Sequence, residues 1–122
     1  MPILDIEIIG EASPAASPSL AQDLADEAGR VFGARPGTTW VRLRTLSPAH
    51  YAENAAVVEA LDRPVFVTVQ KRELPARAQL SDEIAALTRA VARAVGRPAE
   101  RVHVKYETAA AGRQAFGGTL IE

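Results

Sequence analysis

Pro2, which directly follows Met1, is the residue with the most unusual chemical potential in the sequence. The strand-like run ILDIEII comes straight after it. One interpretation is structural, because proline has no backbone N–H and costs little at the start or edge of a strand. The other is chemical. Removal of Met1 would leave Pro2 as a free secondary amine, held in place by the strand behind it.

Three arginines are candidates for binding an anion. Arg42 and Arg44 alternate with apolar residues in the run TTWVRLRTL, so they share one strand face with Trp40. For Arg44 the favoured interpretation is a place on a solvated strand face or in a salt bridge. For Arg42 this interpretation and a substrate-binding role are equally supported. Arg72 lies inside the charged run KRE and, on composition alone, belongs to a surface charge cluster.

The two histidines lack the paired spacing of metal ligands, so no metal site is expected. His103 lies in the run ERVHVKYET, where a strand-face histidine with a structural hydrogen bond is more common than a catalytic one. His50 and Tyr51 fall in the turn-like segment SPAHYAEN and are interpreted as loop residues.

The first half of the chain predicts a strand, a helix and a second strand. Residues 3–9 alternate between apolar and acidic, as in a strand with one wet face. In the Gly-, Pro- and Ser-rich loop that follows, Ser17 or Ser19 can cap a helix that runs to about Phe32. The segment GARPG ends this helix, and residues 38–46 form the second strand.

The second half repeats this order. Residues 63–71 are rich in β-branched side chains and form the strongest predicted strand. A helix follows from about Ala76 or Ser81 to Val95, where Gly96 and Pro98 end it, and residues 100–108 form another strand. The remaining segments are a link at 47–62, turn-like and then a short helix or extended, and a glycine-punctuated tail at 109–122.

These elements add up to two β-α-β units of similar length in a single domain, 1–122. We interpret them as an internal duplication with pseudo-repeats of about 1–60 and 61–122. Two such units predict an α+β fold, in which one four-stranded sheet carries both helices on one face. The other face is left open, and other copies of the chain are its simplest cover.

Composition excludes several classes of partner. Fourteen basic and fifteen acidic residues give a net charge of -1, without the basic excess of a nucleic-acid-binding protein. The absence of cysteine excludes disulfides and thiol catalysis. No signal-peptide pattern and no apolar run near the roughly 20 residues of a membrane span is present. We therefore expect a soluble, cytoplasmic protein.

Three features together carry a resemblance to a known family. They are the Met1-Pro2 start leading into a strand, the segment GRQAFGGTL at 112–120, and the duplicated β-α-β pattern. With these features the chain resembles the tautomerase superfamily, and within it the fused 4-oxalocrotonate tautomerase-like proteins, over essentially its whole length. The resemblance implies a homotrimer without a cofactor, in which the mature N-terminal proline is the catalytic base or acid.

Carried over by position, the resemblance implies that Pro2 is catalytic. It also implies that Arg42 and Arg72 bind a small anionic substrate, a 2-oxo or 2-hydroxy acid. His103 occupies in the second repeat the position of Arg42 in the first. The candidates for an apolar wall of the pocket are Trp40, Tyr106 and Phe116.

The sequence also departs from the family pattern. Ala12 stands near the position of a substrate arginine in the short tautomerases, and Gln114 stands where they have an aromatic residue. Pro64, which begins the second repeat, is internal and has no free amine. Leu74 or Pro75 replaces the second arginine of related decarboxylases and dehalogenases, which weakens the case for those activities.

We therefore expect an isomerase that catalyses keto–enol tautomerisation of a small 2-hydroxy-dienoate or enolpyruvate-type acid. A neutral Pro2 amine would take a proton and return it. Burial near arginines would lower the pKa of this amine, so that it is neutral at pH 7. Two alternatives stay open. A hydratase, dehalogenase or decarboxylase acting on a three-carbon acid would need a cationic Pro2. A non-catalytic member of the family would keep Met1, which makes Pro2 an amide.

Overall fold

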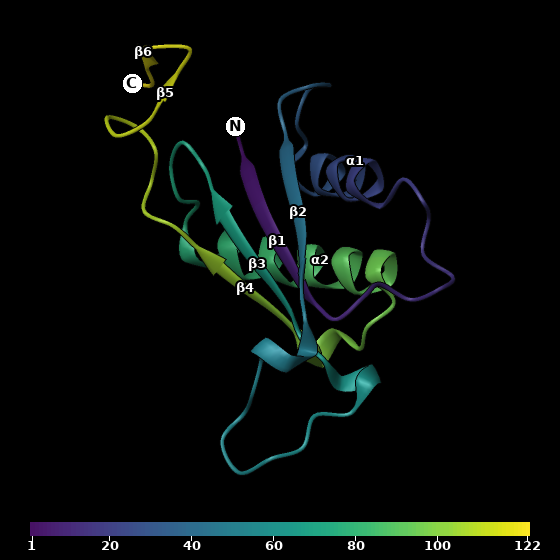
Figure 1. Cartoon of the computed structure of the whole chain (residues 1–122). Helices are drawn as coiled ribbons and strands as arrows, with labels where there is room; N and C mark the ends of the chain where they lie inside the picture. Colours follow the sequence, from purple (N-terminus) through teal and green to yellow (C-terminus); the bar gives the residue numbers. More distant parts are fainter.

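Each half of the chain forms one β-α-β unit in the computed structural model, which describes residues 1–122 (Figure 1). The first unit is β1 (Ile3–Ile9), α1 (Leu20–Phe32) and β2 (Trp40–Leu46). The second is β3 (Val65–Gln70), α2 (Arg77–Val95) and β4 (Val102–Tyr106). Shorter elements are the 3₁₀ turns Pro48–His50, Ala60–Asp62 and Ala99–Arg101, and the hairpin β5 (Ala115–Phe116) with β6 (Thr119–Leu120).

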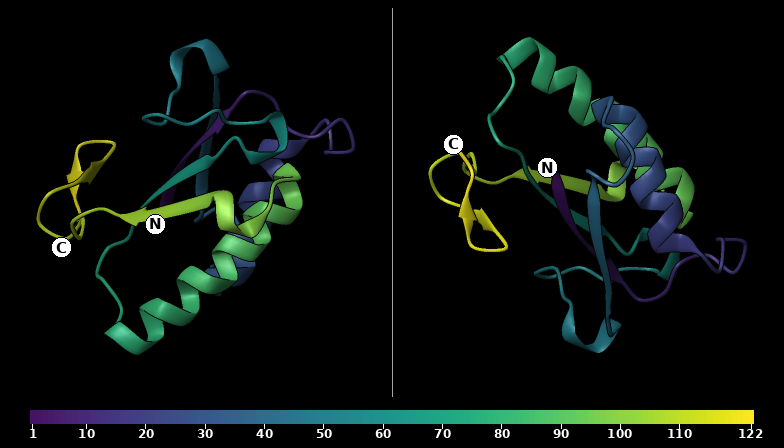
Figure 2. Two further views of the ribbon diagram at one scale, coloured as in Figure 1. Left: turned by 90° about the horizontal axis from the view of Figure 1, so that it is seen from below. Right: turned by 90° about the horizontal axis from the view of Figure 1, so that it is seen from above.

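The four long strands form one sheet in the order β2-β1-β3-β4. Each β-α-β unit contributes a parallel pair, and the units join through the antiparallel pair β1 and β3 at the centre. Both helices lie on the same face of the sheet (Figures 1 and 2). The predicted fold class is confirmed, whereas the origin of the two halves by duplication stays a prediction.

The core lies between the sheet and the two helices. Leu4, Ile6 and Ile8 of β1 are at most 1% exposed, because alternate residues of this strand point toward the helices. Leu24 of α1 and Leu87 of α2 meet them from the other side. Each such side chain contributes about 1.5–3 kcal/mol by leaving water, so this one-sided core is the main source of stability.

Both helices end where the glycines predict. Gly33 and Gly96 adopt left-handed backbone conformations, with φ of 60° and 80°. A Cβ added at Gly96 would lie 2.4 Å from the Cβ of Ser13, so only glycine fits there. The predicted serine cap of α1 is wrong in detail, because Ser19 occupies the N-cap position but its side chain makes no capping hydrogen bond. Neither helix combines the length and apolar character required to cross a membrane.

The link between the units is pinned to the second one by Arg101. Its guanidinium donates to the Glu53 carboxylate and to the Asp62 carbonyl. The Tyr51 hydroxyl donates to the same carboxylate over 2.7 Å. The link therefore contains two short 3₁₀ turns, with chain outside any helix or strand between them, and side chains hold it in place.

We expect both tyrosines to stay protonated at pH 10 as long as the chain is folded. Burial, together with the Glu53 carboxylate, raises the pKa of Tyr51, and burial with the Glu83 carboxylate raises that of Tyr106. Since the folded pKa values exceed the unfolded value of about 10, stability is present below pH 10 and is lost as pH rises through the folded values. A spectrophotometric titration should show tyrosinate appearing only above pH 10 while the chain is folded. Tyrosinate appearing near pH 10 in the folded chain would contradict this.

Candidate active site

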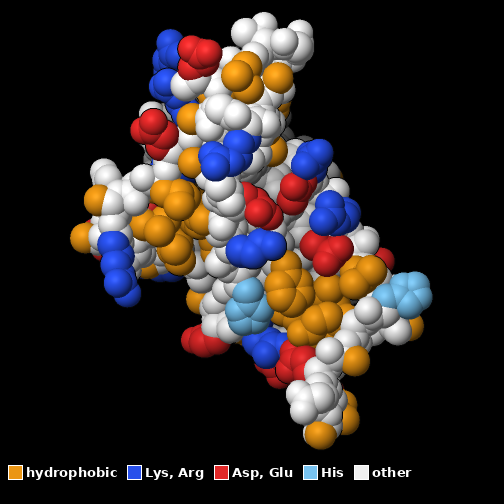
Figure 3. Space-filling model, turned by 90° about the vertical axis from the view of Figure 1, so that its left-hand side faces the viewer, with side chains coloured by type: hydrophobic (Ala, Val, Ile, Leu, Met, Phe, Trp, Pro, Cys, Tyr) orange, Lys and Arg blue, Asp and Glu red, His pale blue; other side chains and the backbone are white.

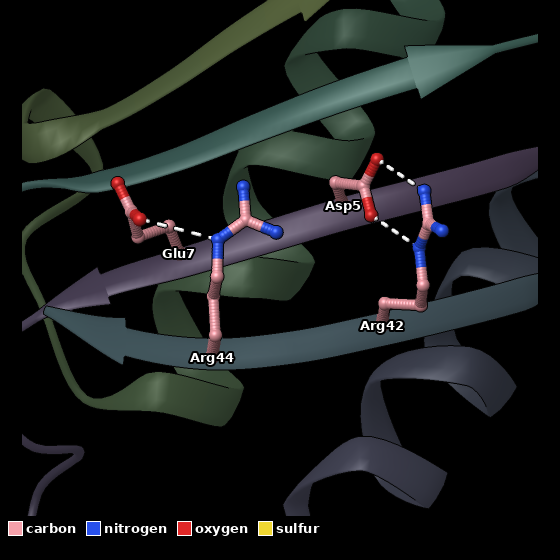
Figure 4. Close-up of polar contacts among 4 residues, drawn as sticks. All are labelled: Asp5, Glu7, Arg42 and Arg44. Carbon is pink, nitrogen blue, oxygen red and sulfur yellow. Dashed lines mark hydrogen bonds and ion pairs between the residues drawn. The ribbon is translucent and has the colours of Figure 1, made fainter.

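The face of the sheet opposite the helices carries two ion pairs between β1 and β2 (Figure 4). Arg42 donates from Nε to Oδ1 of Asp5 over 2.6 Å and from Nη2 to Oδ2 over 2.9 Å. Arg44 donates from Nε to Oε2 of Glu7 over 3.2 Å. Figure 3 shows oppositely charged side chains interspersed across the middle of the molecule, with hydrophobic side chains and a histidine below them. The middle of the open face is therefore charged, and hydrophobic side chains border it.

Each member of the Asp5–Arg42 pair stabilises the charged form of the other. The hydrogen bonds from Arg42 lower the pKa of Asp5, although partial burial acts in the opposite direction. Only Nε and Nη2 of Arg42 are engaged, so its Nη1 group remains available to a further acceptor.

This pair predicts a specific effect of acid. Because the folded pKa of Asp5 is lowered, its stabilising effect is present above the unfolded value of about 3.9 and is lost as pH falls below it. Asp5→Asn should therefore flatten the acid limb of the stability–pH profile, measured by urea unfolding. Glu59→Gln, at an exposed position without an ion pair, is the control and should leave the slope unchanged. An unaltered slope in Asp5→Asn would contradict the assignment.

A cavity of about 500 Å³ lies on this open face, at the end of the sheet where β1 begins. Trp40 and Phe116 form an aromatic wall, with ring centroids 4.9 Å apart. The Trp40 indole N–H donates to the Gly37 carbonyl over 3.0 Å, which fixes the ring. The residues that line the cavity are Ile3, Asp5, Trp40, Arg42, Thr68, Gln70, Glu107, Thr108, Arg113, Gln114 and Phe116.

The C-terminal segment contributes Arg113, which the sequence analysis missed. The only hydrogen bond of its side chain is a long one, 3.4 Å from Nη1 to the Ala109 carbonyl, and it forms no ion pair. The cavity thus holds two guanidinium groups, of which Arg42 is paired and Arg113 is not. The only sequence signal for Arg113 was its place in the glycine-rich segment beside Phe116.

Pro2 lies at the rim of this cavity and is not part of its lining. It directly precedes Ile3, a lining residue, and its carbonyl accepts a hydrogen bond from the Trp40 backbone N–H over 3.0 Å. Pro2 is buried, and the strand alternation turns its ring toward the helix side. Pro2 therefore leads directly into β1 and is hydrogen-bonded to β2 at the cavity end of the sheet.

The other candidates from the sequence lie outside the cavity. Arg72, after β3, donates from Nε to the Glu122 carbonyl over 2.6 Å. His103 stacks obliquely on Phe66, with centroids 5.7 Å apart, toward the opposite end of the open face. Tyr106 points to the helix side, where its hydroxyl donates to Glu83. The structure brings together Trp40, Arg42 and Phe116 but not these three.

Tyr106 belongs to a separate cluster that the sequence analysis also missed. Glu83 accepts from Tyr106 and from Lys71 Nζ, the latter over 2.8 Å. The Lys71 ammonium also lies 5.0 Å from the centroid of the Phe32 ring. The half-buried ammonium, carboxylate and phenol satisfy one another, so the cluster ties α2 to the sheet.

With this geometry the chain has the tautomerase fold. A fused 4-OT that forms a symmetric trimer superposes with a TM-score of 0.77 at 20% identity, covering 97% of this chain and 94% of that one. The protein Pt0534, inactivated by 2-oxo-3-pentynoate, gives 0.78 at 19% identity with the same coverage. A malonate semialdehyde decarboxylase gives 0.69 at 17% identity, covering 94% and 90%. No family model matches the sequence, and no curated protein matches it significantly.

Proposed function

We propose that the protein is an isomerase of the tautomerase superfamily that moves a proton within a small 2-hydroxy-dienoate or enolpyruvate-type acid. One observation supports this most. A buried proline at the start of β1 adjoins a cavity that has an aromatic wall and two guanidinium groups. The tautomerase fold over nearly the whole chain, shared with fused 4-OT proteins, supports the same proposal.

In the proposed reaction Pro2, freed of Met1, is the only group that transfers protons. Its neutral amine takes the enol O–H proton, and the resulting ammonium returns a proton to carbon, so a C–H bond replaces the O–H bond. An amine with a pKa near the working pH suits both steps. The proline ring limits the directions of the nitrogen lone pair.

The arginines would bind and stabilise the anion. The Nη1 group of Arg42 is free to donate to the substrate carboxylate or to the oxygen that gains charge, while Asp5 fixes the guanidinium plane. Arg72, at the same end of the sheet, would bind a carboxylate once its contact with the Glu122 carbonyl opens. Trp40 and Phe116 would pack against the apolar part of the substrate and exclude water.

We further propose that the chain works as a homotrimer. Trp40 and Phe66 are 47% and 36% exposed on the face of the sheet that no helix covers, and exposed apolar surface of this kind is typical of an interaction face. Other copies of the chain would cover them. The symmetric trimer of a fused 4-OT with this fold supports that number of subunits.

The experiment measures enzymatic activity and also identifies the residue that reacts. Intact-mass spectrometry should show Met1 removed, and the purified protein should discharge the ultraviolet band of phenylenolpyruvate or 2-hydroxymuconate. The electrophile 2-oxo-3-pentynoate, whose conjugated alkyne accepts an amine, should inactivate the protein and add its mass to the Pro2 peptide. Retained Met1, no turnover of either enol, or an adduct elsewhere would reject the proposal.

A further inference from the structure

Two arginines meet at the far end of the sheet, away from Pro2. Arg63 precedes β3, and Arg97 follows the end of α2. A Cβ built on Gly10 would lie 3.4 Å from Nη1 of Arg63 and 3.6 Å from Nη2 of Arg97. The two guanidinium groups therefore border the same small space above Gly10, which adopts a φ of 81°.

Neither arginine has a carboxylate partner. Arg97 is only 8% exposed, and its charge is met solely by carbonyl groups. It donates to the carbonyls of Arg63, Ile9 and Glu11 over 3.0, 3.0 and 2.8 Å. Its pKa is lowered, first by burial and then by the positive charge of Arg63. Two like charges thus share a partly buried place without a counter-ion.

The roles of the two arginines differ. Arg97 holds the β1–α1 loop and the start of β3 together, so it is structural, but its Nη1 group makes no hydrogen bond. The side chain of the half-buried Arg63 makes no hydrogen bond with any other residue. No structural contact therefore accounts for its guanidinium group.

A cavity of about 390 Å³ opens beside the pair. Glu11 and Ala12 line it, and their backbone N–H groups donate no hydrogen bond within the chain. Pro14, Pro48 and Leu61 give it a partly apolar wall. The exposed Glu11 carboxylate also lies at this cavity but pairs with neither arginine.

We propose that this cavity is a binding site for a small molecule that carries an oxyanion, a carboxylate or a phosphate. Arg63 grips the anion with its free guanidinium fork, and Arg97 adds a buried, immobile charge from its Nη1 side. Guanidinium groups match the paired oxygens of both anions in geometry. The anion would relieve the repulsion between the two cations. The site lies apart from the cavity near Pro2. The anion-binding proposal therefore does not depend on the isomerase proposal, and each can be tested separately.

The test is a titration of the uniformly ¹⁵N-labelled full chain, followed by amide NMR, with sodium phosphate and separately with sodium acetate. Sodium chloride at matched ionic strength is the control. Saturable shifts confined to Gly10, Glu11, Ala12 and Gly96 are expected with at least one of the two oxyanions, and the stronger one identifies the ligand class. Chloride should produce none of them.

Arg63→Gln should weaken this binding by at least about tenfold, because it removes a charge-assisted pair of hydrogen bonds. The thermal midpoint of the free protein should stay the same or rise, since one of two repelling charges is gone. The matched control is Arg35→Gln, at an exposed arginine without an ion pair, and it should bind as the wild type does. Glu11→Gln should strengthen binding by roughly two- to fivefold.

Three results would overturn the proposal. The first is that chloride at the same ionic strength produces the same amide shifts as phosphate and acetate do. The second is that Arg63→Gln binds the oxyanion as tightly as the wild type does. The third is that Arg63→Gln breaks up the assembly in sedimentation, while no small anion binds to the wild type. In that case a carboxylate of another copy of the chain, and not a free ligand, would occupy the cavity.

Discussion

Replacing Pro2 with alanine, in protein from which Met1 has been removed, is expected to lower kcat/KM for phenylenolpyruvate by about 10²–10⁴-fold. Alanine leaves a primary amine on a chain end without the ring that fixes the lone pair, so proton transfer loses its orientation. The measurement is the initial rate of loss of the enol band, for wild type and variant at matched concentrations. An undiminished rate in the variant would contradict the role of Pro2.

A control separates lost chemistry from a lost fold. The carbonyl of residue 2 still accepts the hydrogen bond from the Trp40 N–H in the variant, so the chain should stay folded, with a thermal midpoint lowered only by the loss of the buried proline ring. A second form, extended by residues in front of Met1 so that Pro2 remains an amide, should be as slow as Pro2→Ala. Full activity in the extended form would show that no free amine takes part.

The second large effect is expected at Arg42. Arg42→Gln should lower kcat/KM by about 10²–10³-fold, because it removes a preorganised cationic donor from the place where negative charge develops. If Arg42 binds only the carboxylate, the loss should appear in KM. If it faces the developing oxyanion, the loss should appear in kcat. Steady-state kinetics with both enols measure the two parameters.

Arg44→Gln is the matched control for this prediction. Arg44 lies on the same strand and the same face, and it forms the same kind of ion pair with an acidic residue of β1 (Figure 4). It does not line the cavity. Arg44→Gln should change kcat/KM by less than about threefold, since exposed ion pairs contribute little. Equal losses of kcat/KM in both variants would show that activity depends on the overall charge of this face. They would contradict a specific binding role for Arg42.

Most of the fold could be predicted from local patterns. The alternation in residues 3–9 defined a strand with one buried face, and Gly33 and Gly96 marked both helix ends. The predicted strands at 38–46 and 100–108 are shorter in the structure, Trp40–Leu46 and Val102–Tyr106, because hydrogen bonds to neighbouring strands decide where a strand ends. The link was the weakest prediction, since Arg101 holds it from a distant part of the sequence.

The cavity could be predicted only in part. Alternation alone put Trp40 and Arg42 on one face, and the structure agrees. The same rule, applied to the register of β4 against β3, would have put Tyr106 on the helix side with Val102. Asp5 as the partner of Arg42 required the β1–β2 register, and Arg113 required the path of the C-terminal segment. Neither follows from local periodicity.

The pKa of the Pro2 amine tests the central claim most directly. Protein with Met1 removed and with ¹⁵N-labelled proline can be titrated by NMR through the nitrogen shift of Pro2. We expect a pKa below the ordinary α-amino value of about 7.7–8.0, because burial and neighbouring guanidinium groups disfavour the ammonium form. A pKa well above that range would contradict a base and point to a cationic proline, as a hydratase or decarboxylase would need.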